Sequence, residues 1–306
     1  MDLLICSMCG AQHDTRFAKS CKVCDDPRQY IPPGGQTWTT LRSMQTSGQY
    51  RNKFQMDKNH SGLISITTVP QVAIGQRAIL CCTPAGNVLW DCITYIDDET
   101  VSHIKSLGGI EAIVISHPHY YATSVHWAEA FDCPVYVSAE DEEWLMRQAP
   151  ETRRFPAGEI WLNYRRTVGH VLWEGKELNL LDQFKAVKVG GHFPGSSVLL
   201  WEEPKKLLVA DSIMVVPSGV YHTDRLPGTT SFSFMWSYPN FIPLPPDDVH
   251  NIWKALADLE FEDTHGAFWG RDTIGQSKKR LLESAQIYIK YAGYTDHAIH
   301  KETIKE

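Results

Sequence analysis

The sequence contains no apolar run of about 18 residues, the length that crosses a lipid bilayer as a helix. Its first residues, MDLLICSMCGAQHD, lack the basic and then apolar segments of a secretory signal. Low-complexity segments and internal repeats are also missing. We therefore expect a protein that is not exported, has no membrane partner and works in the cytoplasm.

Positive charge is not in excess, because 36 Asp and Glu outnumber 29 Lys and Arg, for a formal net charge of −7. Such a chain has no sequence-wide attraction to nucleic-acid phosphates, so nucleic acid is not an expected partner. Apolar residues make up 43% of the chain, which is typical of a globular protein. Its 10 Trp, 12 Tyr and 11 Phe favour a cavity lined by rings, although core packing accounts for most of them. The expected partner is a small-molecule substrate, an aromatic one included. The oligomeric state stays open, with a homodimer as one alternative.

Four of the eight cysteines form two C-x-x-C pairs: Cys6, Cys9, Cys21 and Cys24. Thiolates at this spacing are typical of a closed tetrahedral metal site, which has no open position for a substrate. We predict a structural ion that stabilises a segment too small to bury a core of its own. Zinc is the favoured ion, and iron in a rubredoxin-like site is the alternative, because thiolates bind both.

Turn-forming residues and changes of pattern divide the chain into three parts. The segment IPPGG ends a metal knuckle at residues 1–35, and the polar and aromatic residues 36–61 are predicted to be a connector. Residues 62–306 alternate short apolar runs with helix-like stretches, as expected of one large domain. Because the strands fall into two groups with helices outside, we predict two sheets packed face to face. Helices are predicted over 97–107, 123–131, 139–148, 246–259 and 277–293.

Potential metal ligands follow directly after apolar runs at four places in this large domain. The run EAIVIS leads into H-x-H, and the runs KAVKV, KLLVA and FEDT each lead into one further ligand: His117, His119, His192, Asp211 and His265. Any one of these histidines alone is explained better by a hydrogen-bonded core or surface position. Their ordered recurrence at strand ends predicts a metal centre.

This arrangement resembles the metallo-β-lactamase superfamily over roughly residues 62–270. Asp91 stands where the family has a strand-end Asp that orders the metal loops. His117 and His119 match the start of the family's H-x-H-x-D-H signature, and the later motifs follow in the same order at His192, Asp211 and His265. The resemblance implies an α/β fold, a four-layer αβ/βα sandwich, with the site at the sheet edges.

The chain departs from the signature at Tyr121 and Ala122, which stand where the family has the Asp and His of a second metal site. The resemblance then implies one active-site ion, zinc or iron, with these ligands: His117, His119, His192 and Asp211. His265 would lose its metal role and act as a neighbouring or proton-transfer group. Tyr120 or Tyr121 is a candidate to hydrogen-bond a bound anion or substrate oxygen, and His126 is a candidate substitute ligand. The alternative is that all three are packing residues.

Residues 216–246 are rich in rings, prolines and polar turn residues. Because they lie between a ligand-bearing strand and a helix, we expect them to cross the mouth of the site as a loop. The alternative is an insertion that only packs on the sandwich. The candidates for lining a substrate pocket are its large aromatic residues: Phe234, Trp236, Tyr238 and Phe241.

The resemblance implies a hydrolase that acts on a small ester, lactone, thioester or amide through a metal-activated water. Without the second-site Asp, Asp211 or a tyrosine would have to orient that water. A lyase or iron oxygenase is an alternative, because three histidines and a carboxylate suit iron as well as zinc. A metal-stabilised binding domain without activity is another. The RNA-processing nucleases of the family are disfavoured, because they use two metals and a basic surface.

Overall fold

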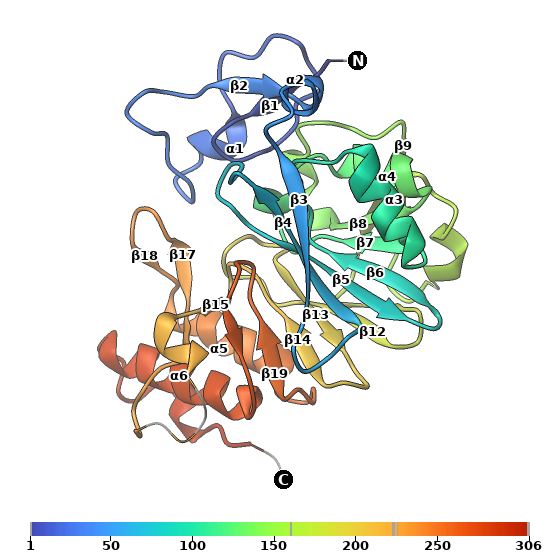
Figure 1. The fold of residues 1–306 in the computed structure, drawn as a ribbon. Coiled ribbons are helices and arrows are strands. Elements are labelled where there is room, and N and C mark those ends of the chain that lie inside the picture. The colour runs from blue at the N-terminus through green and yellow to red at the C-terminus, as the bar shows by residue number, and fades with distance from the viewer. Residues whose placement is uncertain (1, 160, 222–223, 225, 305–306) are drawn as a thin grey trace. The chain divides into compact units, whose positions relative to one another are not determined.

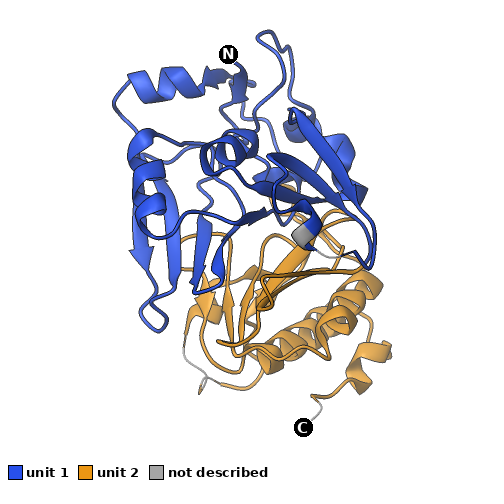
Figure 2. Ribbon diagram, turned by 90° about the vertical axis from the view of Figure 1, so that its right-hand side faces the viewer, with its two compact units in different colours: residues 1–175 blue, residues 176–306 orange. Residues whose placement is uncertain are grey.

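The computed structural model describes residues 2–304 except 160, 222, 223 and 225 (Figure 1). The chain divides into two compact units, Met1–Gly175 and Lys176–Glu306 (Figure 2). Across these described ranges, none of the helices combines the length and the apolar character needed to cross a membrane.

The N-terminal part of the first unit is a small cysteine-containing knuckle built on a two-stranded antiparallel sheet. Its elements are β1 (Leu4–Cys6), α1 (Lys22–Asp25), β2 (Trp38–Thr40) and α2 (Leu41–Thr46). The knuckle thus extends beyond residue 35, because β2 supplies the second strand of its sheet. The next strand, β3 (Arg51–Met56), is an edge strand of the large sheet. Residues 36–61, expected as a connector, therefore belong to two sheets.

The large sheet of the first unit has eight strands in the order β3-β4-β5-β6-β7-β8-β10-β9. Strands β3 to β6 pair antiparallel, and β6 to β9 pair parallel. The remaining bounds are β4 (Leu63–Val69), β5 (Ala78–Thr83), β6 (Gly86–Trp90), β7 (Ala112–Val114), β8 (Pro134–Ser138), β9 (Glu151–Phe155) and β10 (Gly169–Trp173). The parallel strands β7, β8 and β10 are buried throughout, which explains their continuous apolar character.

Helices α3 (Asp98–Ser106) and α4 (Ser124–Phe131) connect the parallel strands and lie beside them (Figure 1). The side chain of Asp97 caps α3 by accepting a hydrogen bond from the Thr100 N–H, and Gly108 and Gly109 follow its end. Both helices agree with the sequence prediction. The helix expected over 139–148 is instead the 3₁₀ helix η2 (Ala139–Trp144), and η3 (Trp161–Tyr164) lies further on.

Strand β10 carries a fully buried histidine, His170. Burial lowers the pKa of His170 to about 4, whereas an unfolded chain titrates near 6.5. Between these values the unfolded chain binds a proton that the folded chain does not, so stability falls as the pH drops from 6.5 and levels off below about 4. At about 1.4 kcal/mol per pKa unit, the free energy of unfolding falls by on the order of 3 kcal/mol between pH 6.5 and about pH 4.

We expect the apolar variant His170→Leu to lose this part of the pH dependence. Urea unfolding of both proteins between pH 4 and pH 7 measures it. Stability curves that run parallel for the two proteins would contradict the assignment.

The second unit contains a six-stranded sheet in the order β11-β12-β13-β14-β19-β20, in which only the β14–β19 pair is parallel. Its bounds are β11 (Glu177–Leu180), β12 (Phe184–Lys188), β13 (Ser197–Trp201), β14 (Lys206–Leu208), β19 (Asp263–His265) and β20 (Asp272–Thr273). Shorter elements are β15 (Met214–Val215), η4 (Pro217–Val220), β16 (Phe232–Ser233), β17 (Met235–Ser237), β18 (Ile242–Pro243) and η5 (Ala298–Lys301).

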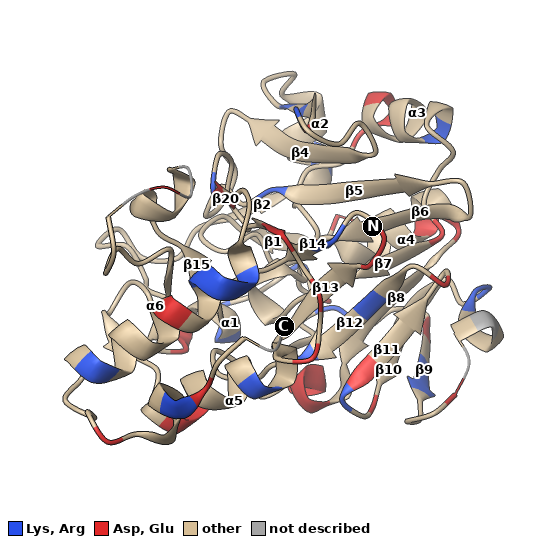
Figure 3. Ribbon diagram, turned by 90° about the horizontal axis from the view of Figure 1, so that it is seen from below, with Lys and Arg blue, Asp and Glu red and all other residues tan. Residues whose placement is uncertain are grey.

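Helices α5 (Pro246–Leu256) and α6 (Ser277–Tyr291) contribute to the core of the second unit. The apolar residues of α5 follow helical spacing, so they share one face, which is buried: Val249, Ile252, Trp253 and Leu256. Acidic and basic residues both occur along α5 and α6 (Figure 3). Both helices were predicted, whereas strands β3, β9, β10 and β11 were not.

Candidate metal centres

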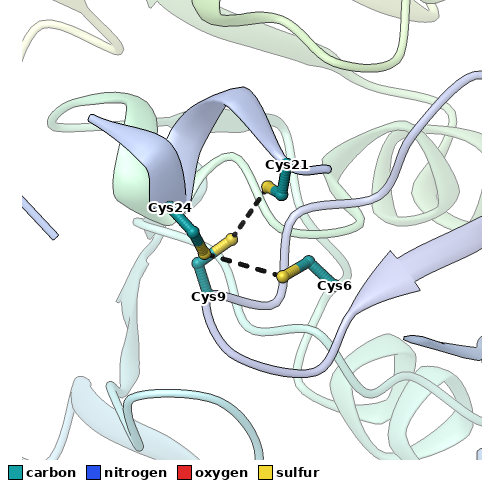
Figure 4. Close-up of side chains that lie close together, drawn as sticks. All are labelled: Cys6, Cys9, Cys21 and Cys24. Atoms are coloured by element: carbon teal, nitrogen blue, oxygen red, sulfur yellow. Dashed lines mark hydrogen bonds between the residues drawn. The ribbon is translucent and has the colours of Figure 1, made fainter. Parts of the chain in front are cut away.

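The four knuckle cysteines are buried free thiols that converge on one point (Figure 4). The sulfurs of Cys6 and Cys24 lie 3.6 Å apart, those of Cys9 and Cys21 lie 3.7 Å apart, and all four lie within 4.8 Å of one another. A tetrahedral ion with metal–sulfur bonds of about 2.3 Å separates its sulfurs by about 3.8 Å. The cluster therefore fits one metal ion.

Neighbouring groups favour the thiolate form of Cys21. Hydrogen bonds from the Cys24 thiol first, and from other thiols and the His13 ring, hold the pKa of Cys21 well below its usual range. His13 Nε2 lies 3.3 Å from Cys21 Sγ, and its ring packs edge-on against Trp38. The thiolate is the form that binds metal. The sequence offered no signal for His13, because it stands outside the C-x-x-C pairs.

In the first unit, His117 and His119 lie at the 3₁₀ helix η1 (Pro118–Tyr120), which follows β7. Both are buried, and their ring centroids are 5.0 Å apart. Ser116 Oγ lies 2.9 Å from His117 Nδ1. This hydrogen bond orients the imidazole ring and leaves Nε2 as the atom that can coordinate an ion. The Asp91 carboxylate accepts a hydrogen bond of 2.7 Å from the Ser116 N–H. Asp91, at the end of β6, thereby holds the start of this loop.

Tyr120 and Tyr121 are both buried beside these histidines. The Tyr120 ring packs against His117, with 4.8 Å between centroids. The Tyr121 hydroxyl donates to the backbone carbonyl of Asp141 at 3.3 Å, and burial raises the pKa of Tyr121 well above 10. The Tyr121 hydroxyl thus has a backbone partner, and the roles expected for Tyr120 and Tyr121 at a bound substrate stay predictions.

His126 does not replace the missing ligands either. It lies on α4, where its Nε2 is 3.3 Å from the Gln12 side chain and its Nδ1 is 3.2 Å from Glu129. Both ring nitrogens therefore have partners of their own.

In the second unit, His192 and Asp211 form a buried pair, with 3.6 Å between His192 Nε2 and Asp211 Oδ2. Two ligands of a tetrahedral ion with bonds of about 2.0–2.2 Å lie roughly 3.3–3.6 Å apart, so this pair has the spacing of metal ligands. Met235 O lies 3.2 Å from His192 Nδ1 and orients the ring with Nε2 toward Asp211. The Tyr238 hydroxyl donates to the Asp211 carbonyl at 2.9 Å.

His265 forms a second carboxylate–histidine pair in the same unit. Its Nδ1 lies 3.1 Å from Asp272 Oδ1, and its buried Nε2 has no hydrogen-bond partner among the described residues. The carboxylate favours a proton on Nδ1, which makes Nε2 an acceptor or a ligand. Asp272 was missed because it stands seven residues after His265, and only the antiparallel register of β19 and β20 places the two opposite each other.

The four aromatic residues of segment 216–246 do not form one lining, although residues 222, 223 and 225 of this segment lie outside the described residues. Phe234 is fully buried in the core of the second unit, where its ring packs edge-on against Tyr288. Trp236 is partly buried against the same core, and Phe241 is 82% exposed. Tyr238 lies beside a candidate ligand, with 6.2 Å between its ring centroid and that of His192. The expectation that Phe234 lines a pocket is therefore wrong.

Substitution of two aromatic residues of this segment tests whether Phe234 is a core residue. We expect Phe234→Ala to lower the free energy of unfolding by roughly 3–5 kcal/mol, because it leaves a cavity in a packed core. The matched variant Phe241→Ala should change it by no more than about 0.5 kcal/mol, because that ring is exposed. Urea denaturation measures both, and equal effects would place the two rings in the same environment.

No family model matches this chain. The uncharacterized protein YmaE of Bacillus subtilis (strain 168) is 41% identical over 295 residues, which cover 95% of this chain and 97% of YmaE. The chain belongs to the same family as YmaE. The name of this relative assigns no activity to the family.

Solved structures of metallo-β-lactamases resemble this member of the YmaE family. TMB-1 matches with a TM-score of 0.51 and 13% identity, covering 79% of this chain and 99% of TMB-1. VMB-1 matches with a TM-score of 0.51 and 10% identity, covering 79% of this chain and 100% of VMB-1. The chain therefore has the metallo-β-lactamase fold, which confirms the expectation from its histidine and aspartate motifs.

Proposed function

We propose that this protein is a metal-dependent hydrolase with one active-site ion, and that its ligands are those implied by the order of the sequence motifs: His117, His119, His192 and Asp211. The observation that carries the proposal is the His192–Asp211 pair, a buried imidazole and a buried carboxylate at the spacing of two ligands of one ion. The fold and the order of the four motifs support it.

Each histidine of the proposed site is oriented by a neighbouring group. Ser116 orients His117, and the Met235 carbonyl orients His192, so little reorganisation is needed when an ion binds. The ion, zinc or iron, would activate water and polarise the carbonyl of a small ester, lactone, thioester or amide. Asp211 orients the attacking water with its carboxylate. The His265–Asp272 pair accepts a proton at Nε2 and passes it to the leaving group.

A panel of small esters, lactones, thioesters and amides tests this proposal. We expect metal-loaded protein to hydrolyse at least one class, and Asp211→Asn to lose at least about 10²-fold in kcat/KM, because the neutral amide is a poorer metal ligand and orients the attacking water less well than the carboxylate. The matched control is Asp296→Asn, an exposed carboxylate outside the site.

Fully metal-loaded protein that hydrolyses no class would contradict the proposal. Iron-dependent oxygen consumption in the same preparation would then favour an oxygenase. Capture of a small ligand without turnover would favour a binding domain.

A further inference from the structure

The cysteine knuckle contacts the segment that follows the two metal-binding histidines of the first unit. The Gln12 N–H donates to the Ala122 carbonyl at 3.1 Å, and the Thr94 hydroxyl donates to the Gly10 carbonyl at 3.2 Å. Gly10 has a φ of 81°, and a Cβ there would stand only 2.2 Å from Thr94 Oγ1. Glycine therefore permits the close approach. Backbone groups of the knuckle thus join it to the rest of the unit.

Ala122 is held in an unfavourable backbone conformation at this contact. Its φ of 42° lies in the left-handed region, which costs a residue with a Cβ about 1–2 kcal/mol. Such conformations persist where the surroundings hold them. The backbone N–H of Gln12 donates to the Ala122 carbonyl. Thr123, which follows Ala122, donates its hydroxyl to the Thr94 carbonyl at 2.8 Å. Ala122 is three residues from His119, so the contact restrains the end of the metal loop.

The Gln12 side chain extends the same contact to two other segments. Its Oε1 accepts a hydrogen bond of 2.6 Å from Arg147, and its Nε2 lies 3.3 Å from His126 Nε2 on α4. Gln12 is 3% exposed, and the Arg147 side chain is 13% exposed. One buried amide therefore connects the knuckle, α4 and the loop after η2. Truncating it would remove the 2.6 Å acceptor of this largely buried Arg147 and leave the Glu129 carboxylate at 3.5 Å.

We propose that the metal-loaded knuckle positions the loop of His117 and His119, with Gln12 as the positioning residue, and thereby raises the affinity of the histidine site for its ion. The inference rests on the proposed function, because it requires an ion at that site. A loop that is already ordered loses less conformational entropy when the ion binds. The positions that depart from the H-x-H-x-D-H signature, Tyr121 and Ala122, are those beside this contact.

Zinc binding alone tests the coupling, without any substrate. Metal-free wild type and variants are titrated with Zn²⁺ against a chromophoric chelator, and Co²⁺ spectra separate thiolate from imidazole ligation. We expect Gln12→Ala to keep the cysteine-bound ion and to bind the histidine-site ion roughly tenfold more weakly, as is typical when a group that orients ligands is lost. Gln12→Glu should recover most of the affinity, because its carboxylate still accepts from Arg147.

The matched control is Gln36→Ala, which removes a glutamine bonded to Cys21 and Asp25 within the knuckle. It should leave the histidine site unchanged while the cysteine ion stays bound. If Gln12→Ala does not fold, Thr94→Val removes the bond to Gly10 and is expected to weaken the same site.

Two outcomes overturn different claims. Wild type and Gln12→Ala that bind both ions with equal affinity would overturn the coupling alone. Wild type that binds Zn²⁺, and in a parallel titration Fe²⁺, only at its cysteines would overturn the proposed function, and the coupling with it.

Discussion

His119→Ala is expected to lose both the active-site ion and all measurable hydrolysis, while it keeps the cysteine-bound ion. Removing one of three imidazoles leaves a site with two imidazoles and one carboxylate and no strong replacement, because the Tyr121 hydroxyl is bonded to Asp141 and Ala122 has no donor atom. Elemental analysis should find about two metals per chain in wild type and about one in the variant.

Two further histidine variants are compared with His119→Ala. His103→Ala removes an exposed histidine of α3 and should keep both ions and full activity. His265→Ala should lower activity strongly but keep most of the metal, because His265 pairs with Asp272 and is proposed to transfer protons. Anomalous diffraction locates each ion. Two ions about 4 Å apart, the separation of two-metal sites, would contradict the single-ion proposal.

Cys21→Ser is expected to cause the largest loss of stability. Structural zinc sites contribute about 10–16 kcal/mol of binding free energy in small domains, and this binding is coupled to folding. Even a net loss of about 5 kcal/mol corresponds to a fall of roughly 8 °C in Tm, because an unfolding entropy of about 2.1 cal/mol/K per residue amounts to about 0.64 kcal/mol/K for 306 residues. With zinc in excess, turnover per folded molecule should change much less, because the cysteine cluster has no position for a substrate.

Differential scanning calorimetry and zinc content measure this effect. The matched control is Cys82→Ser, which replaces a thiol of β5 outside the cluster and should change Tm only slightly. A Cys21→Ser protein with the Tm and zinc content of wild type would show that the cluster binds no structural ion.

Local patterns were sufficient for several elements and for most candidate ligands. The spacing of Val249, Ile252, Trp253 and Leu256 predicts one apolar face of α5, because side chains three and four positions apart share a side of a helix. The two C-x-x-C pairs and the H-x-H pair can likewise be recognised in the sequence. Their short spacing, or their place at a strand end, is typical of residues that bind one ion. The expectation of the metallo-β-lactamase fold came from the order of these motifs.

The sequence by itself therefore determined the cysteine cluster, the candidate histidine and aspartate ligands and the fold. Only the tertiary structure decided the roles of the side chains that surround the candidate ligands or form the core. Phe234 is a core residue because of its packing against α6, Asp272 orients His265 through strand register, and Gln12 meets Arg147 across 135 residues of chain. These contacts join residues whose separation in sequence follows no period, so only the folded chain brings them together.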